Sequence, residues 1–159
     1  MKNLNVMVIL AIATLSSLAL ASGGGGSKET KKAVVEATPS ESHQLMETGK
    51  KQIAAKDWSS AVATFKKATE VDAKNADAFN YLAYSTRKSG KPADALPIYE
   101  KALQLDPKHL GALEYQGEAY LELKRVADAQ KNLDKIKAIC GIKCEQYVDL
   151  ESAIKTVKK

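Results

Sequence analysis

The sequence predicts an all-α fold in which pairs of helices repeat along the chain. Small residues recur at a spacing of 34 positions, at Ala61, Ala95 and Ala129. Apolar residues follow at offsets of three and four within each segment, which is typical of amphipathic helices. The composition agrees, because the chain is rich in Ala and Lys and only 6% aromatic. Such a composition favours helices over a β-sandwich.

Three units of this length fit into the chain, at residues 42–75, 76–109 and 110–143. Asp57 is suited to cap the start of the second helix in the first unit. Pro92 is suited to a first helical turn, where its missing N–H costs nothing. The breaks that divide each unit into two helices are expected at Lys56-Asp57, at Ser89-Gly90-Lys91-Pro92 and at Lys124-Arg125.

The first 21 residues predict a secretory signal. Lys2 is the only charged residue before Lys28, and an apolar stretch runs from Val6 to Ala21. This stretch is shorter than the roughly 20 residues of a membrane-spanning helix. The basic start, the short apolar core and the final Ala-Leu-Ala indicate export to the periplasm or the medium, with cleavage after Ala21 and no membrane span afterwards. A retained membrane anchor is the alternative.

Residues 22–41 predict a flexible linker. Gly23–Gly26 is followed by Ser27 and by mixed charges, and Val34-Val35 is the only strongly apolar pair. Such a segment buries too little apolar surface to offset the entropy lost on ordering. It is interpreted as a tether, with plain spacing as the alternative.

The repeating units resemble the tetratricopeptide repeat. This resemblance implies a right-handed superhelical solenoid of three helix-turn-helix units, which binds a protein or an extended peptide in its concave groove. With the signal-like start, the chain is similar to small exported proteobacterial proteins of this family. The second unit matches best, through Phe79, Leu82, Ala83, Gly90, Ala95, Tyr99, Ala102 and Pro107.

Residues 144–159 predict one more amphipathic helix. Tyr147, Leu150, Ile154 and Val157 recur at intervals of three, four and three. A solenoid needs its last apolar face covered to remain soluble, so this helix is expected to cap the third unit. A partner-binding helix is the alternative.

Cys140 and Cys144 are expected at the corner between the last repeat helix and the cap. In an unbroken helix residues four apart hold their Cβ atoms ~5–6 Å apart, whereas a disulfide needs about 3.5–4.5 Å. A bond therefore requires the helix to break, and Gly141 permits this. A structural disulfide is the prediction, with a redox-active pair or a two-thiolate metal site as alternatives.

The first helix of each unit is expected to line the groove. Tyr84 with Arg87 and Lys88 is expected to hold an extended acidic peptide by stacking and charge-assisted hydrogen bonds. A solvated helix face is the alternative. A column here means the equivalent position in successive repeat units. The predicted groove residues are Lys50, Asp77, Asn80, Tyr84, Arg87, Lys88, Glu114 and Glu118, with His43, Met46 and Glu122 in groove-facing columns as well.

Family members that grip a C-terminal carboxylate carry Asn in one groove column, where this chain has Glu47, Tyr81 and Tyr115. That clamp is therefore incomplete, and its ligand is not expected here. Tyr81 and Tyr115, together with Tyr120, are expected to pack in the core or between helices.

No catalytic, metal or cofactor site is predicted. His43 and His109 lie far apart, and two cysteines are too few for a four-thiolate zinc site. Gly23–Gly26 lacks a following Gly-Lys-Ser/Thr, and the mixed charges form no patch for nucleic acid. The sequence thus predicts a non-enzymatic binding scaffold or assembly factor of the cell envelope. A thiol–disulfide redox protein and a self-associating subunit are the alternatives, and the oligomeric state is left open.

Overall fold

The computed structural model describes residues 40–157, and within this range it contains seven helices and no strand. The predicted signal segment and nearly all of the predicted linker lie outside the described residues. The helices are α1 (Glu41–Ala54), α2 (Trp58–Val71), α3 (Ala76–Lys88), α4 (Pro92–Leu105), α5 (Leu110–Glu122), α6 (Val126–Cys140) and α7 (Glu145–Val157).

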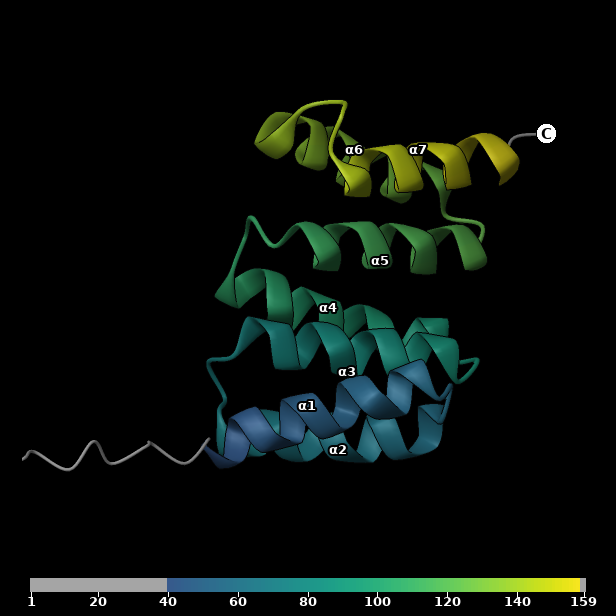
Figure 1. Cartoon of the computed structure of the whole chain (residues 1–159). Helices are drawn as coiled ribbons and strands as arrows, with labels where there is room; N and C mark the ends of the chain where they lie inside the picture. Colours follow the sequence, from purple (N-terminus) through teal and green to yellow (C-terminus); the bar gives the residue numbers. More distant parts are fainter. Residues whose placement is uncertain (1–39, 158–159) are drawn as a thin grey trace, which may run out of the picture. The chain divides into compact units, whose positions relative to one another are not determined.

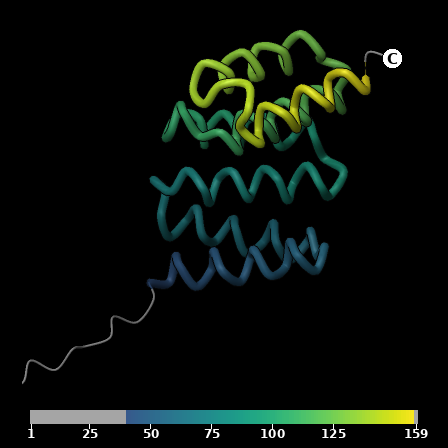
Figure 2. Tube along the Cα trace, turned by 45° about the horizontal axis from the view of Figure 1, so that its top comes forward, coloured from purple at the N-terminus to yellow at the C-terminus, as the bar shows by residue number. Residues whose placement is uncertain are grey.

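These helices form three pairs, α1–α2, α3–α4 and α5–α6, which stack in chain order and end with α7 (Figure 1). The trace in Figure 2 follows this order from one end of the stack to the other. The first helices contact one another in succession, α1 with α3, α3 with α5, and α5 with α7. We call α1, α3, α5 and α7 the first-helix layer. The predicted all-α solenoid of helix pairs is confirmed.

Local signals set the helix starts. The amide of Ser60 donates to Oδ1 of Asp57 (3.1 Å), and Pro92 occupies the first turn of α4, as predicted. The hydroxyl of Ser40 accepts a hydrogen bond from the amide of His43 and caps α1. The helix therefore starts at Glu41, a residue that the sequence analysis assigned to the linker. An Asn or Ser oxygen at this position satisfies an amide that has no partner inside the helix.

Each helix pair turns at a residue in the left-handed conformation. These residues are Lys56 (φ 57°), Gly90 (φ 86°) and Lys124 (φ 60°), and they occupy the same position in successive units. The conformation costs residues with a Cβ roughly 1–2 kcal/mol, and only glycine avoids this cost. The first and third turns are therefore strained where the second is not.

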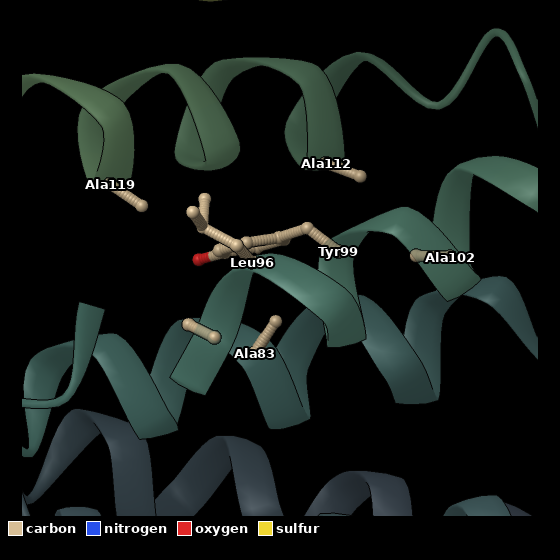
Figure 3. Close-up of a cluster of buried hydrophobic side chains, with 7 residues drawn as sticks. Ala83, Leu96, Tyr99, Ala102, Ala112 and Ala119 are labelled. Carbon is tan, nitrogen blue, oxygen red and sulfur yellow. The ribbon is translucent and has the colours of Figure 1, made fainter. Parts of the chain in front are cut away.

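The core consists of large side chains of one helix packed against small residues of its neighbours. In the central cluster, Leu96 and Tyr99 of α4 lie between Ala83 of α3 and both Ala112 and Ala119 of α5 (Figure 3). Removing this apolar surface from water stabilises the fold by roughly 25 cal/mol per Å².

Helix α7 covers the last repeat by a close approach to α5. Leu150 and Ile154 are buried, and a Cβ placed on Gly117 would lie 2.6 Å from Cδ2 of Leu150. Glycine is thus required at this point of contact. Tyr147 is half-buried, but Val157 is 50% exposed although the sequence placed it on the apolar face. Val157 ends the helix, beyond the last turn that packs on α5.

The corner after the third unit differs from the two before it. At the first two corners, Asp72 accepts a hydrogen bond from the amide of Lys74 (3.1 Å) and Asp106 accepts one from the amide of Lys108 (3.0 Å). At the third corner, Cys140 occupies the equivalent position of the repeat. Its Sγ is paired with Sγ of Cys144, and the two Cα atoms are 6.0 Å apart. Gly141 ends α6 with a φ of 84°, so the break required by the spacing is present.

The strained turns lead to a first prediction. Lys56→Gly and Lys124→Gly should each raise the free energy of unfolding by about 0.5–1 kcal/mol, because relief of the left-handed strain exceeds the added entropy of the unfolded chain. Gly90→Ala should lower it by about 1 kcal/mol. Urea unfolding followed by circular dichroism measures all three changes. A loss of stability in both glycine variants would contradict the explanation.

The juxtaposed sulfurs lead to a second prediction. The non-reduced protein should be lighter than the reduced protein by the mass of two hydrogen atoms. Cys140→Ser should lower the free energy of unfolding by on the order of 2 kcal/mol, because the closed loop is short. A Cys140→Ser, Cys144→Ser variant is the control, since both should lose the same amount. Two free thiols in the air-exposed protein would show that the pair is unbonded.

Candidate functional site

The predicted groove residues all lie on the first-helix layer, but the structure gives them different environments. Lys50, Asp77 and Lys88 are exposed, and Tyr84 and Glu118 are half-buried. Asn80, Arg87 and Glu114 are buried, with 4%, 6% and 6% of their surface exposed. The expected exposure of these three residues is therefore wrong, because neighbouring helices pack closely enough to cover them.

Three aromatic rings form a row across α2, α3 and α5. The ring centroids of Trp58 and Tyr84 are 6.1 Å apart, and those of Tyr84 and Tyr115 are 4.9 Å apart. Cations lie against the row, with Nζ of Lys88 5.9 Å from the Trp58 ring and Cζ of Arg87 5.5 Å from the Tyr84 ring. All three rings are half-buried, so each keeps part of its surface exposed.

The three tyrosines expected in the core or between helices pack against the core clusters and keep part of their surface exposed. Tyr81 stacks on Phe65 with 5.3 Å between ring centroids, and it retains partial exposure. Tyr115 and Tyr120 pack against the central cluster. Burial, followed by the nearby Glu114, raises the pKa of Tyr115 to about 12.

Arg87 is committed to two carboxylates of α5. One terminal nitrogen pairs with Glu118, and Nη1 lies 2.6 Å from Oε1 of Glu122. Burial lowers its pKa, but Tyr99 and these carboxylates outweigh burial and the net shift is upward. Arg87 is therefore charged, and the two carboxylates already balance that charge. Its Nε is buried and has no hydrogen-bond partner in the part of the chain that the structure describes. An acidic peptide at Arg87 stays a prediction.

Glu114 lies where α3, α5 and α7 face one another, and no hydrogen bond or ion pair reaches its carboxylate among the described residues. Burial raises its pKa to about 8, and Glu118 of α5 with Asp149 and Glu145 of α7 contribute further. Arg87 of α3 opposes them only in part. Near neutral pH Glu114 therefore holds a proton within a group of carboxylates.

Two other predicted residues are engaged with neighbours. Lys50 pairs with Glu47 at 3.0 Å. Oδ1 of Asp77 lies 3.0 Å from Nε2 of His109. Nδ1 of the same His109 accepts a hydrogen bond from the amide of Ala112 (3.1 Å) and thereby caps α5. Since Nδ1 is an acceptor, the proton of the neutral ring is on Nε2 and is donated to Asp77. The sequence analysis missed this cap, which occupies the repeat column of Asn75.

The sequence analysis also missed three hollows. One of about 330 Å³ lies at the α1 end of the first-helix layer and includes His43, Met46 and Lys50. Another, of about 580 Å³, lies between α4 and α6 over the buried, hydrogen-bonded side chains of Gln116 and Asn132. The third, about 410 Å³, lies among α3, α5 and α7 and is lined by Arg87, Glu118, Leu121, Glu122, Ala153, Thr156 and Val157.

Residues 40–157 also bear on two other kinds of site, a metal centre and a membrane span. No group of three His, Cys, Asp or Glu residues in this range is placed to hold a metal ion. None of its helices is both long and apolar enough to cross a bilayer.

Comparison with known families identifies the repeats. Sequence models of the tetratricopeptide repeat match residues 47–108 and residues 87–139, and together they span more than half of the 159 residues. The chain belongs to the tetratricopeptide repeat family. It is also 26% identical over 83 residues to protein O-mannosyl-transferase Tmtc3 of Drosophila melanogaster, covering 52% of this chain but 9% of that protein. The chain thus spans less than a tenth of this relative.

Solved structures of repeat proteins share the fold. The type III secretion chaperone SycD of Yersinia enterocolitica, in complex with a peptide of the translocator YopD, is similar with a TM-score of 0.66 and 19% identity, over 72% of this chain and 90% of that chain. The first repeat domain of Spaghetti, bound to an HSP90 peptide, has the same TM-score and identity over 74% and 94%. The TPR2B domain of yeast Sti1, in its pHsp70 complex, has a TM-score of 0.67 and 18% identity over 74% and 95%.

The buried carboxyl leads to a third prediction. Glu114 keeps its proton in the folded protein up to about pH 8, whereas its ordinary pKa is 4.5. Its contribution to stability is complete below pH 4.5 and is lost as pH rises through about 8, because the unfolded state then binds fewer protons. Glu114→Gln should remove this decline and stabilise the protein at pH 9 by on the order of a few kcal/mol.

Urea unfolding between pH 5 and 9 measures the effect. Glu70→Gln, at an exposed position of α2, is the control for loss of one carboxylate. Parallel stability curves for the parent and Glu114→Gln would mean that Glu114 ionises normally in the folded protein.

Proposed function

We propose that this protein is a non-enzymatic scaffold that binds a segment of a partner protein, or an extended peptide, on the first-helix layer. The observation that carries this proposal is a row of partly exposed aromatic rings, Trp58, Tyr84 and Tyr115, of which the two tyrosines lie on first helices. Structures with the same fold are solved in complex with peptides of a translocator and of HSP90.

Stacked helices suit this task because they present the face already formed. The row of rings supplies flat apolar surface, and its bordering polar groups supply hydrogen bonds to a peptide backbone. Little ordering entropy then opposes binding, since the helices and their buried contacts exist before the peptide arrives.

We further propose that the protein acts outside the cytoplasm, in assembly within the cell envelope. The pattern of residues 1–21 supports export. The pairing of Cys140 with Cys144 fits an oxidising compartment, where disulfides persist. The intact mass of the protein recovered from its native cells tests export, because cleavage after Ala21 leaves Ser22 as the first residue.

One observation favours a second candidate, a thiol–disulfide redox role. Cys140 is exposed and lies next to its partner sulfur, so a dithiol substrate has access to the bond. The position of the pair at a helix corner, in the column of Asp72 and Asp106, favours a structural role instead. Reduction of insulin by the protein with dithiothreitol discriminates, since a structural disulfide gives no rate above the background.

Site-specific photocrosslinking tests the face used for binding and provides a fourth prediction. Benzoylphenylalanine at Lys50 or Lys88 should crosslink the partner, because both side chains are exposed on first helices. The same group at Glu70 of α2 or Glu100 of α4 is the matched control and should not. Equal crosslinking from all four positions, or crosslinking only from the second helices, would move the interface away from the first-helix layer.

A further inference from the structure

The hollow of about 580 Å³ lies on the second helices of the last two units. Helices α4 and α6 both pack on α5, which lies between them in the stack, and no contact joins α4 to α6 in the described range (Figure 1). Gln116 of α5 and Asn132 of α6 form the buried floor, and Leu103 and Tyr120 line the walls. The volume is within the range of small-molecule sites, roughly 300–1,000 Å³.

The two amides of the floor are particular to the third unit. Gln116 and Asn132 are buried, with 4% and 3% of their surface exposed. The equivalent positions of the other units carry no amide and are not buried: Thr48 and Thr64 in the first unit, Leu82 and Ile98 in the second. Burial of an amide costs free energy unless its polar atoms find partners, so the repeat packing by itself does not account for this pair.

Hydrogen bonds fix the orientation of both amides. Nδ2 of Asn132 donates to the carbonyl oxygen of Leu113 (3.0 Å) and to Oε1 of Gln116 (2.9 Å). Because a backbone carbonyl only accepts, the amino group of Asn132 must lie on this side, and the oxygen of Gln116 must face it. Nε2 of Gln116 and Oδ1 of Asn132 then remain, and neither takes part in a hydrogen bond within residues 40–157.

These two unused atoms are open to the hollow. The unpaired side-chain atoms that the described protein encloses completely belong to other residues, whereas Gln116 and Asn132 line the hollow. The floor therefore offers one donor and one acceptor on neighbouring amides. A hydroxyl group matches this pair, because it accepts and donates at the same oxygen.

The charges at the hollow favour a small neutral ligand. Glu100 and Asp128 are balanced by Lys131 and Lys135, and Asp128 already pairs with Lys131 at 3.0 Å. The centres of protein interfaces are depleted of charged residues and built around large apolar or aromatic anchors. Four charged side chains around one half-buried ring, that of Tyr120, do not form such a centre.

We propose that this hollow binds a small neutral molecule rich in hydroxyl groups, of the size of a mono- or disaccharide. One hydroxyl accepts from Nε2 of Gln116 and donates to Oδ1 of Asn132. The apolar face of the sugar ring lies against Tyr120 and Leu103. The inference does not rest on peptide binding, because the hollow lies away from the exposed groove residues of the first-helix layer.

Saturation-transfer difference NMR on the full chain tests the site, with glucose, N-acetylglucosamine, maltose and trehalose as probes. At least one of these saccharides should bind saturably, and glucuronate should bind no better than glucose because the hollow has no excess of positive charge. In ¹⁵N-labelled protein the side-chain NH₂ signals of Gln116 and Asn132 should shift on titration. Those of Gln52, on α1 and outside this hollow, should not.

A double variant, Gln116→Leu and Asn132→Ile, gives the third unit the residues of the second. It should weaken saccharide binding about tenfold or more, because both hydrogen bonds of the floor are lost. It should stay folded, since replacing both partners of a buried polar pair by apolar residues leaves no unsatisfied group between them. Gln52→Leu is the matched control and should keep the parent's affinity, and circular dichroism checks the fold of each variant.

Absence of saturable binding by all four saccharides would overturn the proposal. Unshifted NH₂ signals of Gln116 and Asn132 in the parent, or unchanged affinity in a folded double variant, would also overturn it by placing the saccharide elsewhere. Acetamide is the last probe: shifts of the same signals with acetamide but with none of the saccharides would replace the hydroxyl ligand with an amide.

Discussion

The whole stack depends on close contact between helices at positions where one side chain has almost no volume. Gly49 faces Phe65 across the first pair, and Gly117 faces Leu150 of α7, in both cases without room for a Cβ. Ala83 occupies the same column in the second unit, beside Tyr99 (Figure 3). Because dispersion and burial both fall steeply with separation, a larger residue here would part the helices and lose the contacts around it.

This closeness also determines the electrostatics of the first-helix layer. Arg87 of α3 reaches Glu118 and Glu122 only because α3 and α5 are in contact. Docking of α7 through Leu150 places Asp149 near Glu114, which raises the pKa of that buried carboxyl. Packing thereby brings charged residues of three helices together in one acidic region.

Local sequence signals predicted local structure well. Asp57 and Pro92 start helices, and Gly141 ends one, because each acts through its own backbone and the next few residues. The environment of Arg87 could not be predicted in this way. Its position in the repeat indicated a groove, but its partners lie 31 and 35 residues away along the chain. A repeat pattern does not show which positions of the neighbouring repeat carry the opposite charge.

By itself, the sequence determined the helix pairs, the positions of their turns and the capping helix, because periodicity and breakers act over one or two helical turns. The tertiary structure alone decided which polar groups are buried, that the charge of Arg87 is balanced, that Glu114 has no hydrogen-bond partner among residues 40–157, and where the hollows lie. The physical reason is that charge interactions and burial depend on distances in space, and these are set only when the helices have packed together.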